Sequence, residues 1–183
     1  MNAVRALLLA TLLLLPSLAR AGIPVWQPGG ISVCGTECQT SVFFVAEDGS
    51  GGVYVAWRES RNVQTSGSDI YLQRILGSGQ IAPGWPDDGL PVCTVNGSQN
   101  LGGVQADRNG GALVIWSDLR DAATFSSDVY VQRVNADGTI AEGWPENGAA
   151  ACNWPGSQVT PALIATPGGG AFVAWGDDRD FGL

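Results

Sequence analysis

Three segments of this chain decide its fold: GVYVAWRESR at 52–61, GALVIWSDLR at 111–120 and GAFVAWGDDR at 170–179. Each begins with Gly, runs through β-branched and aromatic residues to a Trp, and ends with Arg. In an extended strand alternate side chains point to opposite faces, and in these segments both faces are apolar. A strand of this kind is expected to lie between two packed sheets.

The spacing of these segments extends over most of the chain. Aligning residues 52–110 with residues 111–169 requires no gap and gives 23 identical residues in 59 positions. Residues that recur at this interval include Trp57, Trp116 and Trp175; Trp26, Trp85 and Trp144; Cys34, Cys93 and Cys152; Asp69 and Asp128; Arg74 and Arg133. A fixed interval of this length predicts stacked structural units.

Each unit is predicted to contain three clear β-strands and a weaker fourth. Apolar runs and alternating patterns predict strands at 41–46, 53–57, 69–75, 101–106, 112–116, 128–134, 161–165 and 171–175. Gly-rich turns separate the first two strands of a unit, and no stretch after residue 21 has helical periodicity. We therefore predict an all-β fold of small antiparallel sheets, which is typical of β-propeller blades.

The 59-residue units are expected to form an incomplete ring. The predicted boundaries are a partial unit at 22–39, full units at 40–98 and 99–157, and a partial unit at 158–183. Propellers close with four or more blades, so either the chain is a piece of a longer protein, which we expect, or several copies assemble. Open blade faces would also favour self-association.

The N-terminal residues 1–21 have the pattern of a secretory signal peptide. One Arg precedes an apolar run at 6–15, and small residues at 19 and 21 fit a cleavage site after Ala21. The apolar run is too short for a membrane-spanning helix, and no later segment is long enough for one. We predict a secreted or periplasmic protein without membrane insertion.

The charge of the chain excludes some partners. Without Arg5 and Arg20, seven basic and 17 acidic residues remain, a net charge of −10. Such a chain repels phosphate backbones, so we expect no nucleic-acid partner. The sequence contains no His, and therefore lacks the usual general base and the commonest metal ligand.

Residues 57–79 and 116–138 share the pattern Trp-x-acidic-x-Arg, a loop, and then Ser-Asp-(Ile/Val)-Tyr-x-Gln-Arg before a turn with Gly. This pattern resembles the WD-like propeller repeats of TolB-type periplasmic proteins and of uncharacterised tandem repeats in large exported bacterial proteins. The resemblance implies a propeller, export and contacts with proteins, and it implies no shared catalytic residues. The longer unit and the Gly-Trp-Pro corner depart from the family pattern.

Charged residues also recur at the 59-residue interval. The arginines are Arg61, Arg120, Arg179, Arg74 and Arg133, and the carboxylates expected to form bidentate pairs with them are Glu59, Asp118, Asp177, Asp69 and Asp128. A catalytic carboxylate pair is needed at one place only, whereas these acids recur in every unit. We therefore predict structural ion pairs and a protein that is not an enzyme.

Two aromatic residues break the pattern. Trp154 replaces Val95, and Phe125 stands opposite Ser66 in the variable loops at 61–68 and 120–127. Each is a candidate ligand contact, and the alternative is an aromatic side chain folded onto its own unit. Recognition usually resides in loops of this kind.

The cysteines permit one local disulfide. Cys34 and Cys38 are close enough in sequence to pair, whereas Cys93 and Cys152 hold matching positions in adjacent units and are expected to be buried free thiols. The spacing does not fit a zinc site, and the short Asp-Gly turns do not fit an EF-hand. We predict no cofactor and no metal.

The function predicted from these features is an exported, non-catalytic propeller-type module that binds or scaffolds proteins or glycans. The alternative is part of a secreted, glycosidase-like hydrolase whose active site lies in further blades. A third interpretation is a gene product without a function of its own.

Overall fold

The computed structural model describes residues 30–35, 38–121 and 126–179, and this part of the chain is all-β, without a helix. The predicted signal peptide at 1–21 lies outside the described residues. The strands are β1 (Thr40–Glu47), β2 (Val53–Glu59), β3 (Asp69–Ile75), β4 (Leu90–Cys93), β5 (Gln99–Ala106), β6 (Ala112–Asp118), β7 (Asp128–Val134), β8 (Ala149–Cys152), β9 (Gln158–Ala165) and β10 (Ala171–Asp177).

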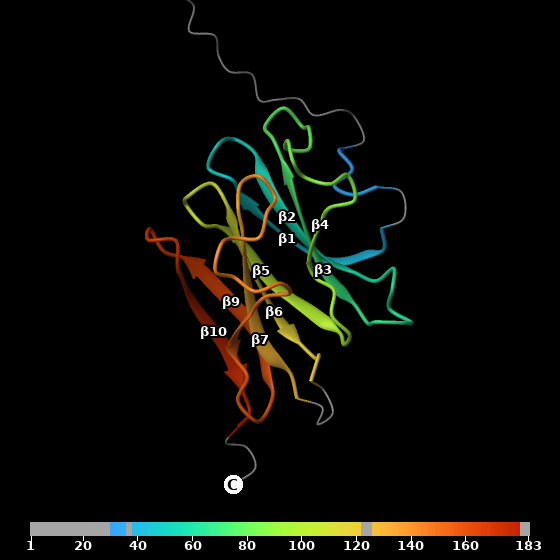
Figure 1. Cartoon of the computed structure of the whole chain (residues 1–183), viewed down its shortest axis with the longest axis vertical. Helices are drawn as coiled ribbons and strands as arrows, with labels where there is room; N and C mark the ends of the chain where they lie inside the picture. The colour runs from blue at the N-terminus through green and yellow to red at the C-terminus, as the bar shows by residue number, and fades with distance from the viewer. Residues whose placement is uncertain (1–29, 36–37, 122–125, 180–183) are drawn as a thin grey trace, which may run out of the picture.

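The strands form three antiparallel sheets whose strand order follows the chain (Figure 1). Sheet 1 has the order β1-β2-β3-β4, sheet 2 has the order β5-β6-β7-β8, and sheet 3 consists of β9 and β10. The first strands of the sheets begin at Thr40, Gln99 and Gln158, which are 59 residues apart. Sheets 1 and 2 are therefore meanders of contiguous sequence with matching strand positions.

The first hairpin of each four-stranded sheet turns on an Asp side chain. Asp48 Oδ1 accepts hydrogen bonds from the backbone amides of Ser50 and Gly52, each at 2.8 Å. Asp107 Oδ1 accepts equivalent bonds from Asn109 and Gly111, also at 2.8 Å. An Asp that binds the amides two residues ahead stabilises a tight turn, which explains why the Gly-rich segments reverse the chain here.

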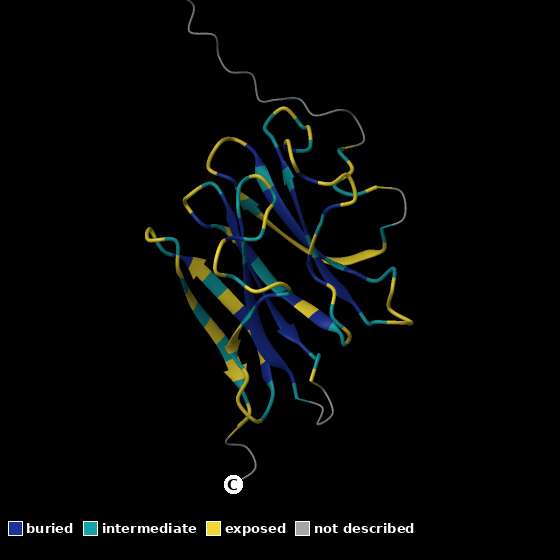
Figure 2. Ribbon diagram, viewed as in Figure 1, coloured by how far each residue is buried: buried dark blue, intermediate teal, exposed yellow. Residues whose placement is uncertain are grey.

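The sheets pack face to face in sequence order. Strand β5 packs against β1, β2 and β3, and β9 packs against β5, β6 and β7. Every residue of β6 is buried because sheet 2 lies between the other two sheets, as the dark blue strands in the middle of Figure 2 show. The prediction from residues 53–57 that the Trp-containing strand is covered on both faces agrees with β2, where Tyr54, Val55, Ala56 and Trp57 are all buried, and the matching strand β6 is buried throughout. In β10 exposed and partly buried residues alternate, because only sheet 2 covers it.

Hydrogen bonds also join neighbouring sheets. Trp85 in the Gly-Trp-Pro corner of sheet 1 donates from Nε1 to the carbonyl oxygen of Ala136 at 3.0 Å. The hydroxyl of Ser68 donates to Gln99 O at 3.0 Å, and that of Ser127 donates to Gln158 O at 2.8 Å. These bonds fix where β5 and β9 begin relative to the sheet before them.

Candidate functional site

A cluster of Trp, carboxylate and Arg closes the end of β6. The carboxylate of Asp118 accepts hydrogen bonds from Trp116 Nε1 at 2.7 Å, from Arg120 Nη2 at 2.6 Å and from the Arg120 backbone amide at 2.8 Å. The Asp118 side chain is fully buried, so these donors replace the water that it loses. A buried carboxylate that is held by three donors in this way stabilises the strand end.

The same cluster recurs at the ends of β2 and β10. Glu59 accepts from Trp57 Nε1 at 3.2 Å and from Arg61 Nη2 at 2.9 Å, and Asp177 accepts from Trp175 Nε1 at 3.1 Å and from the Arg179 guanidinium. Of these three arginines, Arg179 alone binds both carboxylate oxygens of its partner with its guanidinium. The predicted bidentate geometry is therefore wrong for the two clusters in sheets 1 and 2, where one guanidinium nitrogen makes the contact.

An aromatic residue from the third strand completes the clusters of sheets 1 and 2. Trp116 stacks on Tyr130 with ring centroids 6.2 Å apart, and the guanidinium carbon of Arg120 lies 3.7 Å from the Tyr130 centroid. Trp57, Tyr71 and Arg61 repeat this arrangement in sheet 1. In sheet 3 the described residues contain no third strand, and Arg179 instead lies 5.9 Å from the ring of Trp154.

The partners predicted for Arg74 and Arg133 are wrong. Arg74 binds Asp48 Oδ2 through Nε at 3.0 Å and Nη2 at 2.8 Å, and Arg133 binds Asp107 Oδ2 at 2.8 and 2.7 Å. The expected partner Asp69 is five positions from Arg74 on β3, so the two side chains point to opposite faces and lie at opposite ends of the strand. Asp128 and Arg133 stand in the same relation on β7. Asp48 and Asp107 also lie 59 residues apart in the sequence, and this spacing is the feature that could have indicated them as the partners of Arg74 and Arg133.

The pKa is lowered for Asp48, which binds Arg74, and raised for Asp69 and Asp128, the first residues of β3 and β7. Burial alone would raise the pKa of Asp48, but hydrogen bonds from Ser50, Arg74 and the turn amides outweigh it and lower the pKa to about 2. Burial raises the pKa of Asp69, and the charge of Glu59 adds to this effect. Asp69 Oδ1 is buried and has no hydrogen-bond partner. Burial likewise raises the pKa of Asp128, where the charges of Asp121 and Asp118 contribute.

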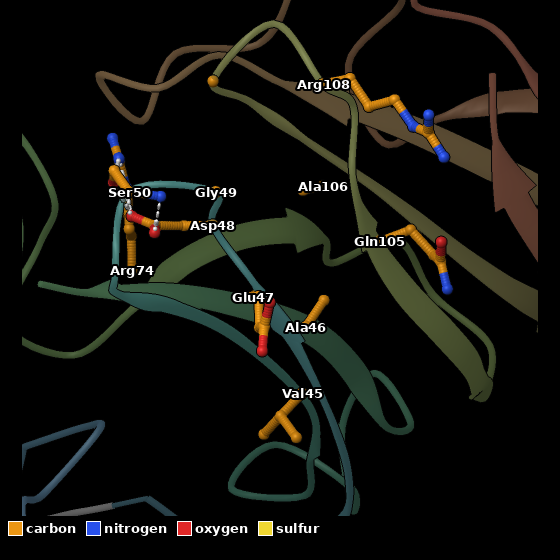
Figure 3. A pocket seen from close by; sticks show the side chains of 11 residues that line it. Val45, Ala46, Glu47, Asp48, Gly49, Ser50, Arg74, Gln105, Ala106 and Arg108 are labelled. Atoms are coloured by element: carbon orange, nitrogen blue, oxygen red, sulfur yellow. Dashed lines mark hydrogen bonds and ion pairs between the residues drawn. The ribbon is translucent and has the colours of Figure 1, made fainter. Parts of the chain in front are cut away.

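A polar groove lies between the first hairpin turns of sheets 1 and 2 (Figure 3). Its volume is about 820 Å³. On one side the Asp48–Ser50–Arg74 network is engaged in the hydrogen bonds drawn in Figure 3, and on the other lies the exposed side chain of Arg108. The groove is at the end of β2 opposite to the variable loop at 61–68, where recognition was predicted.

Two apolar surfaces lie on the outer faces of the first and last sheets. On β1, Phe43 is 69% exposed and Val45 is also exposed; on sheet 3, Phe172 is 73% exposed and Ile164 is exposed beside it. Yellow segments on β1, β9 and β10 mark both surfaces in Figure 2. Two residues at matching positions are buried where sheets face each other: Leu113 matches Phe172 and is 1% exposed, and Val104 matches Val45 and is 5% exposed.

The cysteines occupy two kinds of site. Cys34 and Cys38 form a disulfide, whereas Cys93 and Cys152 are free thiols. Cys93 is buried and 3.4 Å from Arg120 Nη2, but Cys152 is only partly buried, which differs from the prediction. Cys38, although outside the 59-residue spacing, lies 3.4 Å from Arg61 Nη2 in the position that Cys93 has beside Arg120.

The two aromatic residues predicted as ligand contacts have different outcomes. Trp154 is 61% exposed and contacts Arg179, so it is accessible to a partner. Phe125 lies outside the described residues.

Within the described ranges, no group of three or more acidic or Cys side chains is placed to hold a metal ion. The same part of the chain has no helix with the length and hydrophobicity needed to cross a membrane. No protein-family model, no curated protein and no solved structure matches this chain.

Proposed function

We propose that this chain is an exported, non-catalytic β-propeller-type module that binds other proteins through the exposed faces of its outer sheets. The observation that carries the proposal is the apolar character of these faces. Phe43 and Phe172 are large, apolar and mostly exposed, and exposed apolar patches of this kind mark protein interaction sites.

The contacts between the sheets support this role. The face of sheet 2 that matches the Phe172 surface is covered by sheet 3, and the face that matches the Phe43 surface is covered by sheet 1. The two outer faces are therefore the two sides of one type of sheet–sheet interface. A protein that presents a twisted antiparallel sheet, including a second copy of this chain, has the shape and polarity to cover either face.

The repeated charged clusters support a role without catalysis. Each carboxylate of these clusters is held by an Arg and by the indole N–H of a Trp, and the same arrangement is found at three strand ends. We therefore assign these clusters to the framework of the fold, and the interaction surface to the outer faces of the sheets.

The proposal is tested by measuring association of the purified protein by sedimentation velocity between 1 and 100 µM, where we expect concentration-dependent association. Phe43→Ser and Phe172→Ser should each reduce it at least tenfold, because a buried Phe contributes about 2 kcal/mol. Val63→Ser is the matched control, since Val63 is an exposed apolar residue in the loop after β2. Association that is unaffected by both Phe substitutions would refute the role of these faces.

A further inference from the structure

Within the described residues β10 has a free edge, whereas the matching strands β2 and β6 have none. In sheets 1 and 2 the second strand has neighbours on both sides: β2 lies between β1 and β3, and β6 lies between β5 and β7. Within the described residues β10 is bonded to β9 alone. The N–H and C=O groups along its other edge are thus available to a further strand.

An apolar cavity lies beside this edge and over sheet 2. Its volume is about 220 Å³ and it is formed by small and apolar residues of both sheets, namely Leu113, Val131, Trp144, Ala149, Ala150, Ala151, Gly170, Ala171 and Val173. The matching place between sheets 1 and 2 is occupied by β7, whose Tyr130 and Val134 belong to the shared core. The cavity therefore has the position of the inward-facing side chains of a third strand.

The cluster at the end of β10 also lacks one member. Trp175, Asp177 and Arg179 repeat the hydrogen bonds of Trp116, Asp118 and Arg120. In sheets 1 and 2, Trp and Arg enclose a Tyr from the third strand. No Tyr among the described residues holds that place in sheet 3, and the indole of Trp175 is partly exposed.

We propose that the edge of β10 binds an extended polypeptide strand of the pattern Asp–aliphatic–Tyr–aliphatic–Gln–Arg–aliphatic. The register follows from β6 and β7, where Trp116 pairs with Tyr130 and Asp118 pairs with Asp128. The bound strand runs antiparallel to β10, with its Tyr opposite Trp175. Its Tyr packs on Trp175, and its Gln and its last aliphatic residue, which fall opposite Val173 and Ala171, face the cavity.

The main-chain hydrogen bonds supply affinity in this mode of binding, and the cavity supplies specificity. Arg179 leaves Trp154 and covers the Tyr of the bound strand, as Arg120 covers Tyr130. This edge is distinct from the sheet faces of the proposed function, because it joins a strand to sheet 3 instead of covering its outer surface.

The test uses a fluorescent peptide that copies Ser127–Val134, added to the purified protein. We expect saturable binding by anisotropy, and slower hydrogen exchange of amides 171–177. The same peptide with Tyr130→Ser should bind at least tenfold more weakly, because it loses the ring that packs against Trp175 and Arg179, and a scrambled peptide should not bind. Equal binding of the three peptides, or unchanged exchange at 171–177, would overturn the inference.

A pair of protein variants separates the cavity from the outer face of the same strand. Ala171→Tyr places a ring in the cavity and should abolish peptide binding, whereas Ala174→Tyr adds the same ring on the exposed face and should leave it unchanged. Circular dichroism verifies that each variant is folded, and if Ala171→Tyr is unfolded the peptide series decides. Peptide binding by a protein that does not self-associate would refute only the proposed function, and self-association without peptide binding would refute only the strand-binding edge.

Discussion

Replacing Asp48 by Asn removes the charge that holds Arg74 beside the first hairpin turn, and we expect it to lower the free energy of unfolding by about 2 kcal/mol at pH 7. The pKa of Asp48 is about 2 instead of 3.8, and each unit of that difference corresponds to about 1.4 kcal/mol. The product is about 2.5 kcal/mol. The expected loss is slightly smaller because the Arg74 side chain retains some exposure to water.

The pH dependence of this effect has a defined sign. The pKa of Asp48 is lower in the folded chain than in the unfolded chain, so its contribution is complete above about pH 4 and disappears as the pH falls towards 2. The difference in unfolding free energy between the wild type and Asp48→Asn should therefore be constant from pH 7 to pH 5. It should narrow between pH 4 and pH 3.

Asp69→Asn is the matched control in the same sheet. Burial raises the pKa of Asp69, so its charged form opposes folding at neutral pH. We expect the Asn variant to be as stable as the wild type at pH 7, or more stable. Urea unfolding followed by Trp fluorescence measures both variants. A larger loss for Asp69→Asn than for Asp48→Asn would refute the assignment of Asp48 as the partner of Arg74.

Two further predictions concern a turn and a thiol. Gly89→Ala should lower the free energy of unfolding by more than about 2 kcal/mol, because φ is +82° and the new Cβ would lie 2.3 Å from Trp57 Cη2. Gly143→Ala, with φ +80° and open space around it, should lower it by about 1 kcal/mol in the same urea assay. Equal losses would contradict the packing described. Burial raises the pKa of the Cys93 thiol to about 12, so iodoacetamide at pH 8 should modify the partly exposed Cys152 at least tenfold faster. Mass spectrometry of the peptides measures the two rates, and equal rates would show that Cys93 is accessible.

The strands could be predicted closely because their sequences satisfy several requirements at once. The segment at 69–75 has alternating apolar residues and coincides with β3 as it is observed. The strand predicted at 53–57 extends two residues further, to Glu59, because the buried carboxylate at that position caps the strand and is not part of a loop. Polar residues at strand ends have no periodic pattern that would include them.

The ion pairs could be predicted only where sequence proximity determines them. Arg61 and Glu59 are two residues apart and meet through the local chain. Arg74 meets Asp48 across the sheet, 26 residues away, and finding this partner requires the register of β1, β2 and β3. The Gly-rich sequence after Asp48 predicts a turn, and a turn alone accounts for an Asp at this position. It gives no indication that the second carboxylate oxygen, Oδ2, binds the Arg74 guanidinium.

The exposed edge of β10 and the adjacent cavity could not be predicted from the sequence, because both depend on which strands are neighbours. The 59-residue spacing places Trp175 and Trp116 at the same position of a unit. The structure distinguishes them: Trp116 has Tyr130 beside it, and Trp175 has no such neighbour in the described part of the chain.

The contiguous strand order within each sheet has a consequence for synthesis. Because β1 to β4 follow one another in the chain, sheet 1 requires no residue beyond Cys93 to complete its hydrogen-bonded pairs. Contacts between residues close in sequence form rapidly, and protein domains fold from the N-terminus as the chain emerges. We expect the hairpins of sheet 1 to form while later residues are still being translated. The face of sheet 1 that contacts β5 is then already formed when β5 packs against it.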